Sequence, residues 1–423
     1  MPVRASGCPA ATGYDLRWDG SVTFREDTRP TGAAMFEYFP NNYTWSLAVM
    51  SALNRGGQVS EIDEACRPLR EVAGTKALQG DQTQQRAWFE SWMKVAERVR
   101  RQGEADEALG RTISAGRKYL RAGIYFLLAE RMPSHRDPRR LDAFRRGIQT
   151  YRRGLELRRE PVEYVEVPFG EHRLKALFSK APGPGPHPCM VHFDGLDVTK
   201  EIIYAATADE FRRRGMSMLI VDHPGAGEAL RLQGLPSGPD TEKPAGACVD
   251  WLETRSDVDA ERIGIMAISL GGYYAPRAAA FEKRFKCAVA WGAIFDYGRT
   301  VADRIGGRGE PSVPGYAEHV NWVFGCDTIE ESLKVVRQMT LEGVASRITC
   351  PLLVVHGEND RQVPLWHAQR TYDEAINSVG RELKIFRLAD GGAEHCGADN
   401  TPLVVDWMAD WAAEKLGGFP GGA

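Results

Sequence analysis

The sequence has no surplus of basic residues. Its 423 residues include 54 Lys and Arg against 57 Asp and Glu, which gives a formal net charge of -3. Proteins that bind the phosphate backbone of nucleic acids usually carry a clear positive excess. An Arg-rich stretch runs from Arg139 to Arg159, but its apolar stripe indicates the solvated face of a helix. We therefore expect no nucleic acid as a partner.

Long hydrophobic runs are also missing. Residues 1–20 lack the apolar core of a secretory signal. The most apolar helical stretch, Ala122–Ala129, is far shorter than the ~20 residues that a membrane-spanning helix needs. We expect a soluble, cytoplasmic protein that does not act at a membrane.

Motifs that bind metals are absent from the sequence as well. The 8 cysteines are scattered singly without a C-x-x-C pair, which is typical of reduced thiols rather than a disulfide frame. His192, His223 and His319 lie far apart and lack neighbouring ligands at metal-binding spacing. The sequence predicts neither a metal site nor an organic cofactor.

The first part of the chain has the apolar spacing of helices. Trp88, Trp92, Val95 and Val99 recur at intervals of four, three and four residues, which places them on one face of an amphipathic helix. Ser60 to Asp63 resembles a capping box that opens an earlier helix. The pattern stays helical up to about Pro161, so we predict an all-helical domain over residues 1–160.

The pattern then changes to short apolar runs that alternate with helical segments. Continuous apolar runs bounded by turns are typical of a parallel sheet covered on both faces. We predict an α/β fold with a mostly parallel, doubly wound sheet over residues 161–423, and a helical insertion over 295–348. Thr401 and Pro402 are expected to cap and open the last helix. The predicted strands are 172–178, 190–193, 216–221, 263–268, 287–291, 352–355 and 383–388.

A serine follows one of these strands and precedes an Ala-rich helix. In Ala267-Ile-Ser269-Leu-Gly271, the residues two positions before and after the serine are small, as a nucleophile elbow requires. The commoner pattern has glycine at both places, and here Ala267 replaces one. The alternative is that Ser269 is only a helix N-cap in a Gly-rich turn. We predict that Ser269 is a catalytic nucleophile.

An acid and a histidine follow in the order that a catalytic triad requires. Asp360 comes after the strand at 352–355, and His395 lies in the loop after the strand at 383–388. The carboxyl ends of parallel strands lie at one edge of the sheet, so these side chains are expected to meet Ser269. Asp296, one strand earlier, is the competing acid, and it is also a candidate substrate-binding carboxylate.

Two backbone N–H groups are expected to stabilise an oxyanion. Leu270 follows the nucleophile at the start of a helix, and Leu196 follows Gly195 in the loop after the strand at 190–193. A tight strand-to-helix turn, with Lys200 and Glu201 as a solvated pair, adequately explains the nearby Asp197, Lys200 and Glu201.

These motifs resemble the α/β-hydrolase superfamily from about Val162 to Leu416. The Asp194-Gly-Leu-Asp-Val-Thr-Lys-Glu loop, the Ser-Leu-Gly-Gly-Tyr elbow and the Glu-His-Cys loop are similar to the 2,6-dihydropseudooxynicotine hydrolase group, with fungal Ayg-type polyketide-shortening hydrolases and, more distantly, FrsA-like esterases. The resemblance implies a Ser269, Asp360 and His395 triad, cleavage of a carbon–carbon bond beside a ketone, and a helical N-terminal domain that caps the active site.

We therefore predict a serine hydrolase that acts on a carbonyl of a hydrophobic, aromatic or polyketide-like small molecule. A carboxylesterase is the alternative; an acyltransferase, a cyclase or a ligand-binding protein without turnover also fits. A homodimer is a further prediction. The candidate substrate-binding residues are Asp296 and the rings Tyr43, Trp45, Tyr297, Tyr316, His319 and Trp322.

Overall fold

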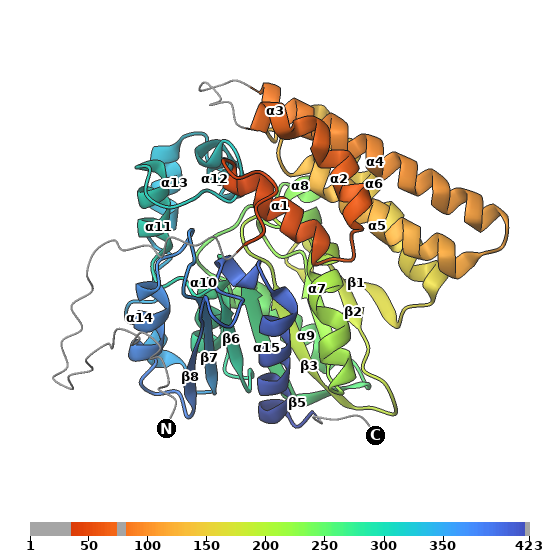
Figure 1. Ribbon diagram of the computed structural model, residues 1–423. Coiled ribbons are helices and arrows are strands. Elements are labelled where there is room, and N and C mark those ends of the chain that lie inside the picture. The colour runs from red at the N-terminus through yellow and green to blue at the C-terminus, as the bar shows by residue number, and fades with distance from the viewer. Residues whose placement is uncertain (1–34, 74–81, 419–423) are drawn as a thin grey trace, which may run out of the picture. The chain divides into compact units, whose positions relative to one another are not determined.

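The structure, a computed structural model, describes residues 35–73 and 82–418. The part of the predicted helical domain before residue 35 lies outside the described residues. Helices come first, and the change to strands falls between Arg158 and Val162. Figure 1 shows the N-terminal helices together at the top of the view, with the strands below them. The division into a cap domain and a catalytic domain stays a prediction.

The N-terminal helices have a core of their own. Trp88, Trp92, Val95 and Val99 are all buried, so the predicted stripe is confirmed. Gly123 lets two helices approach closely, because a Cβ there would lie 2.8 Å from the Cβ of Tyr151. The elements are α1 (Tyr43–Leu53), α2 (Val59–Cys66), η1 (Arg67–Leu69), α3 (Arg70–Ala73), α4 (Thr83–Ala108), α5 (Thr112–Glu130) and α6 (Pro138–Arg158).

Two predicted helix starts are wrong by one or two residues. The helix expected to open with a capping box at Ser60 begins at Val59, and its N-cap Gln58 makes no side-chain cap. The last helix begins at Thr401 with Asn400 as N-cap. The Thr401 hydroxyl donates to the Gly397 carbonyl and accepts from Asn54, so tertiary contacts occupy the side chain that was expected to cap.

The predicted sheet is confirmed, with eight strands in the order β1-β2-β4-β3-β5-β6-β7-β8. The strands β4, β3, β5, β6, β7 and β8 run parallel to one another, whereas β2 pairs antiparallel with both β1 and β4. The strands are β1 (Val162–Phe169), β2 (His172–Ser179), β3 (His187–Phe193), β4 (Ser217–Val221), β5 (Val258–Ile268), β6 (Ala288–Trp291), β7 (Leu352–Gly357) and β8 (Arg381–Phe386).

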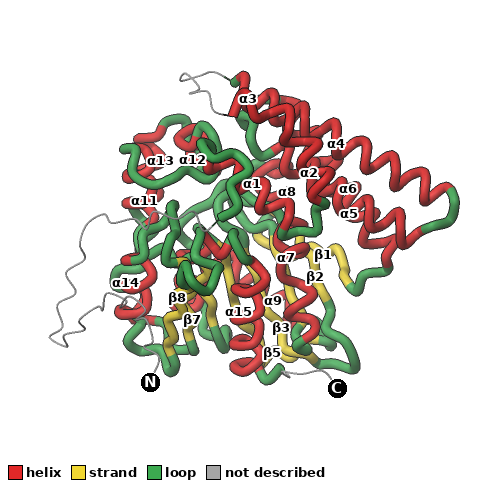
Figure 2. Tube along the Cα trace, in the orientation of Figure 1, coloured by secondary structure: helices red, strands yellow, loops and turns green. Residues whose placement is uncertain are grey.

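Helices cover both faces of the sheet, as Figure 2 shows. Leu219 and Val221 of β4 belong to the core shared with α9 and α10, whereas Met218 and Ile220 face α7 and α15. This alternation follows from the period of two along a strand. The helices are α7 (Lys200–Arg213), α8 (Gly227–Gln233), α9 (Glu242–Glu253), α10 (Gly271–Phe281), α11 (Tyr297–Ile305), α12 (Tyr316–Val323), α13 (Ile329–Val336), η2 (Ala345–Arg347), α14 (Trp366–Glu374), η3 (His395–Gly397) and α15 (Thr401–Leu416).

Candidate active site

Ser269 occupies a sharp turn between β5 and α10. Its φ of 60° lies in the left-handed region, which a non-glycine residue rarely adopts without support. A Cβ on Gly271 would lie 2.5 Å from the Cβ of Ala267, so only glycine fits at that position. The Ser269 N–H donates to the Trp291 carbonyl, which fixes the turn against β6. The local sequence therefore places Ser269 in a turn directly after β5, at the carboxyl edge of the sheet.

The structure brings Ser269, His395 and Asp360 together. Ser269 Oγ lies 2.8 Å from His395 Nε2, and His395 Nδ1 lies 2.7 Å from Asp360 Oδ2. The other carboxylate oxygen of Asp360 accepts hydrogen bonds from the N–H groups of Gln362 and Val363. The acid is thus held in place by its own loop, and the hydroxyl, the imidazole and the carboxylate lie in the order that proton transfer from a serine requires.

Charge shifts the pKa values of the acid and the imidazole in opposite directions. Burial lowers the pKa of His395, but the Asp360 carboxylate raises it more, so that it lies above its ordinary value. Burial raises the pKa of Asp360, but the charge and the hydrogen bond of His395 outweigh this and lower it to about 2. Asp360 is therefore ionised at neutral pH, and His395 is a stronger base than a free imidazole.

The two predicted oxyanion donors lie on loops that touch each other. Leu270 is the N-cap residue of α10, and a Cβ on Gly195 would lie 3.3 Å from the Leu270 nitrogen. Within the described part of the chain, neither the Leu196 N–H nor the Leu270 N–H has a backbone hydrogen-bond partner. Both N–H groups are therefore free to donate a hydrogen bond to a ligand oxygen near Ser269.

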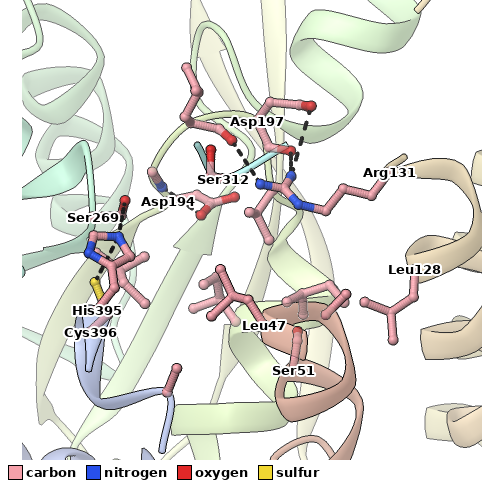
Figure 3. A pocket seen from close by; sticks show the side chains of 18 of the residues that line it. Leu47, Ser51, Leu128, Arg131, Asp194, Asp197, Ser269, Ser312, His395 and Cys396 are labelled. Atoms are coloured by element: carbon pink, nitrogen blue, oxygen red, sulfur yellow. Dashed lines mark hydrogen bonds and ion pairs between the residues drawn. The ribbon is translucent and has the colours of Figure 1, made fainter. Parts of the chain in front are cut away.

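A cavity of about 150 Å³ opens beside Ser269. Figure 3 shows Ser269 and His395 on one side of this cavity. It also shows Leu47, Ser51 and Leu128, which reach the cavity from the N-terminal helices. Its lining comes from α1, α5, the loop after β3 and the loops that carry Ser269 and His395. Much of this wall is hydrophobic, which suits an apolar small molecule.

Asp197 lies in a buried ionic network beside this cavity. Its Oδ2 accepts a hydrogen bond from Arg140 at 3.1 Å, and its Oδ1 forms an ion pair with Arg231. Glu130 of α5 accepts hydrogen bonds from both arginines at 2.6 Å. These charges keep the pKa of Asp197 well below its usual range against the effect of burial. The network joins the loop after β3 to α5, α6 and α8.

The expectation that Lys200 and Glu201 form a solvated pair is wrong. Their exposed fractions are 1% and 0%, and that of Asp197 is 0%. The Lys200 ammonium donates to Asp222 at 2.9 Å and to Glu228 at 2.6 Å. The partners come from segments distant in the chain, which a local turn pattern does not reveal.

None of the seven predicted substrate-binding residues lines the cavity. Asp296 caps α11 by accepting a hydrogen bond from the Arg299 N–H, and Tyr297 is buried in the core beneath α11. His319 Nε2 lies 2.9 Å from Asp197 Oδ2, so it belongs to the ionic network. The competing acid Asp296 therefore has a structural partner of its own.

Two more of the predicted residues, Trp322 and Tyr43, support the lining indirectly. The Trp322 ring lies 4.6 Å from the Arg140 guanidinium carbon, which stacks it on the ionic network. The Tyr43 hydroxyl accepts a hydrogen bond from Gln362, which does line the cavity. Their direct contact with a substrate stays a prediction.

Several cavity residues gave no signal in the sequence analysis. Leu47 and Ser51 of α1, Leu128 of α5 and Arg131, the C-cap residue of α5, line the cavity. They do so because these helices dock over the loop after β3. Cys396 also lines it, with its Sγ 3.5 Å from His395 Nε2. The helical spacing of α1 and α5 could identify buried faces, but not which part of a face meets the cavity.

Residues 35–73 and 82–418 contain neither a metal-binding cluster nor a membrane-spanning helix. No group of three or more His, Cys, Asp or Glu side chains is arranged to hold a metal ion. No helix in these ranges is apolar over a length that could cross a bilayer.

The chain is similar to several known proteins. Residues 213–419 match the prolyl oligopeptidase family. The chain is 28% identical over 331 residues to the 2,6-dihydropseudooxynicotine hydrolase of Paenarthrobacter nicotinovorans, covering 78% of this chain and 86% of that protein. It is 27% identical over 369 residues to the 20-hydroxy-prefusarin hydrolase FUS2 of Gibberella moniliformis, covering 77% and 87%.

A solved structure agrees with these matches. The crystal structure of the 2,6-dihydroxy-pseudo-oxynicotine hydrolase superposes with a TM-score of 0.71 at 27% identity, and the match covers 88% of this chain and 98% of that one. The similarity therefore includes the N-terminal helices as well as the sheet. With its mostly parallel eight-stranded sheet and its helical N-terminal region, the protein is an enzyme of the α/β-hydrolase type.

Proposed function

We propose that the protein is a serine hydrolase that cleaves a carbon–carbon bond next to a ketone in a hydrophobic aromatic or polyketide-like substrate. The observation that carries this proposal is the hydrogen-bonded chain from Ser269 Oγ to His395 at 2.8 Å and on to Asp360 at 2.7 Å. The same chain would serve a carboxylesterase, which is the alternative. The nature of the cleaved bond is therefore the point that needs a direct test.

The chemistry begins at the serine hydroxyl. Neutral His395 takes the Ser269 proton as the oxygen attacks the ketone carbon, and Asp360 stabilises the imidazolium that forms. The Leu196 and Leu270 N–H groups donate to the oxyanion of the tetrahedral intermediate. Collapse of this intermediate breaks the bond to the neighbouring carbon and leaves an acyl group on Ser269, which water then hydrolyses with His395 as base.

Two observations favour the carbon–carbon bond over an ester. Two similar proteins are named 2,6-dihydropseudooxynicotine hydrolase and 20-hydroxy-prefusarin hydrolase, and the first name is that of the group whose resemblance implies carbon–carbon cleavage. A carbanion leaving group also has to be held rigidly, and the cavity beside Ser269 is walled by two helices and the loop after β3. An activated ester would need no such enclosure.

The N-terminal helices act as a cap in this proposal. Leu47 of α1 and Leu128 of α5 line the same cavity as Ser269, so the substrate contacts both parts of the chain. Replacing Leu47 with Trp should lower kcat/KM for bulky aryl ketones by at least tenfold and leave a small acetyl ester almost unchanged. If kcat/KM changed by the same factor for both substrates in this variant, the result would contradict the role of these helices as a cap.

The test is a panel of activated esters, β-diketones and acyl phenols, with the product masses read out. The wild type should release a carboxylic acid and a shortened partner from the diketones, and Ser269→Ala should lower turnover by about three to six orders of magnitude while the fold is kept. Cleavage of the esters alone would identify a carboxylesterase. Acyl transfer to an added alcohol, or no turnover of any substrate, would contradict hydrolysis.

A further inference from the structure

Asp194 is a buried carboxyl group that the triad does not use. It is the residue before Gly195 in the loop after β3, and its exposed fraction is 2%. Its Oδ1 accepts a hydrogen bond from the Gly195 N–H, whereas Oδ2 has no hydrogen-bond partner among the described residues. Figure 3 shows the Asp194 side chain pointing into the cavity between Ser269 and Arg131. A buried polar atom without a partner is rare and calls for an explanation.

The charged groups around Asp194 do not neutralise it. Arg131, the C-cap residue of α5, donates to the carbonyl oxygens of Asp197 and Leu196, and no described arginine or lysine forms an ion pair with the Asp194 carboxyl group. Arg55, two residues after the end of α1, attracts its charge, and the Arg55 side chain donates to the carbonyls of Ile202 and Ser51.

Two other carboxylates oppose ionisation of Asp194. Asp197 in the same loop and Asp222 after β4 repel a negative charge there. Burial is the largest effect and raises the pKa of Asp194 to about 7, against the Gly195 hydrogen bond and the Arg131 charge. His223 Nε2 faces the Asp194 carbonyl at 3.2 Å, and burial lowers the pKa of that imidazole, so it adds no positive charge.

The position of Asp194 next to the oxyanion donors gives its protonation state a chemical meaning. Gly195 packs directly on Ser269, and the donor Leu196 follows it. An ionised carboxylate beside a forming oxyanion would repel it, whereas a neutral carboxylic acid would not. The acid form also carries a proton on the side of Ser269 where the cavity extends and where the departing part of a substrate would lie.

We propose that the protonated Asp194 is the general acid that delivers a proton to the departing carbon during carbon–carbon cleavage. This inference rests on the proposed function, because an ester with a stable leaving group needs no such acid. It assigns to Asp194 the task that distinguishes carbon–carbon hydrolysis from ester hydrolysis, namely the capture of a carbanion.

The protons balance over one turnover. When the tetrahedral intermediate collapses, the electron pair of the broken bond passes to the departing carbon, which takes the proton of Asp194 and leaves it as a carboxylate. The imidazolium of His395 then returns its proton through water to Asp194. Neutral His395 removes a proton from the attacking water and gives it to the Ser269 oxygen as the acid product leaves. The net reaction consumes the ketone and one water.

The experiment compares two substrates in Asp194→Asn, with Ser269→Ala as the control for the triad. Asn keeps the size of the side chain and an oxygen that accepts the Gly195 hydrogen bond, but it carries no acidic proton. We expect kcat for a β-diketone to fall by about 10² to 10⁴, and kcat/KM for a p-nitrophenyl ester to stay within about threefold of the wild type. Equal losses on both substrates, or no loss on the diketone, would overturn the proposal.

The two proposals fail in different ways. A wild type that cleaves esters but none of the ketones overturns carbon–carbon hydrolysis and the acid role together, whereas full ester activity in Ser269→Ala overturns the triad alone. If Asp194→Asn does not fold, the wild type supplies the test. The ratio of diketone to ester kcat/KM should fall about tenfold per pH unit above about pH 7, because only the diketone needs the acid. A constant ratio would overturn the proposal.

Discussion

Gly195 lies directly against the candidate nucleophile Ser269. A Cβ atom on residue 195 would lie 2.9 Å from the Ser269 Cβ and 2.7 Å from the Ile268 carbonyl oxygen. The loop after β3 therefore reaches the serine turn only because residue 195 has no side chain. In the proposed mechanism, this contact sets the distance between the Leu196 N–H and the carbonyl that Ser269 attacks.

Replacing Gly195 with Ala should push the Leu196 N–H away from the oxyanion. A displacement of about 1 Å in such a site lowers the rate by roughly a hundredfold, so we expect kcat to fall by that factor. Gly380→Ala is the matched control, because a Cβ there has no atom within 4 Å, and its kcat should match the wild type. A Gly195→Ala enzyme with the wild-type kcat would refute the role of this loop.

Two single substitutions, compared with each other, can identify the acid of the triad. Asp360→Asn should lower kcat by about 10⁴, because the amide no longer holds His395 in the tautomer that accepts the serine proton. Asp296→Asn should change kcat little, since Asn caps a helix nearly as well as Asp and Asp296 does not line the cavity. Steady-state kinetics on an activated ester checks both variants, and the reverse order of losses would make Asp296 the acid.

The pH profile of ester hydrolysis should report the base. His395 must be neutral to take the serine proton, and the Asp360 carboxylate raises its pKa above 6.5. As pH falls through that pKa the imidazole is protonated and kcat/KM declines, so the acid limb should have its midpoint above pH 6.5. An ester without titratable groups is the substrate to use. A midpoint below pH 6.5 is the outcome that this account does not allow.

The Asp197 network should contribute strongly to the stability of the fold. Asp197→Asn leaves the charges of Arg140 and Arg231 with one carboxylate fewer in a buried place, and breaking such a pair costs about 3–5 kcal/mol. Asn tolerates the positive φ of residue 197, so the backbone is not strained by the change.

The control is Glu64→Gln, which breaks the exposed ion pair with Arg98 and should change the free energy of unfolding by less than about 1 kcal/mol. Urea denaturation followed by circular dichroism measures both variants. Equal stability of the two would show that the network is not a stabilising link.

The meeting of Ser269, Asp360 and His395 could be predicted from the sequence because its signals are local. Each residue follows a short apolar run, and the carboxyl ends of parallel strands share one edge of a sheet. The small residues Ala267 and Gly271 around the serine add a steric requirement that is also visible in the sequence. Element boundaries were less accurate, as the shift of Thr401 from N-cap to first helical residue shows.

The surroundings of the three residues could not be predicted in the same way. In the sequence, Lys200 looks like a solvated turn residue, but in the fold it donates a hydrogen bond to Glu228 of α8. Asp197 looks like an ordinary residue of the same turn, but in the fold it accepts a hydrogen bond from Arg140 of α6. Aromatic residues such as Tyr297 suggested a substrate pocket but lie in the core. The lining from α1 depends on how that helix docks, which is a property of the whole fold.

Covalent labelling tests the central claim most directly. An organophosphonate reacts with an activated serine hydroxyl, and the mass of the modified peptide identifies the residue. We predict a single adduct on Ser269, complete loss of turnover with labelling, and no adduct in Ser269→Ala. An enzyme that keeps its activity after labelling, or an adduct on another residue, would contradict the assignment of Ser269 as the nucleophile.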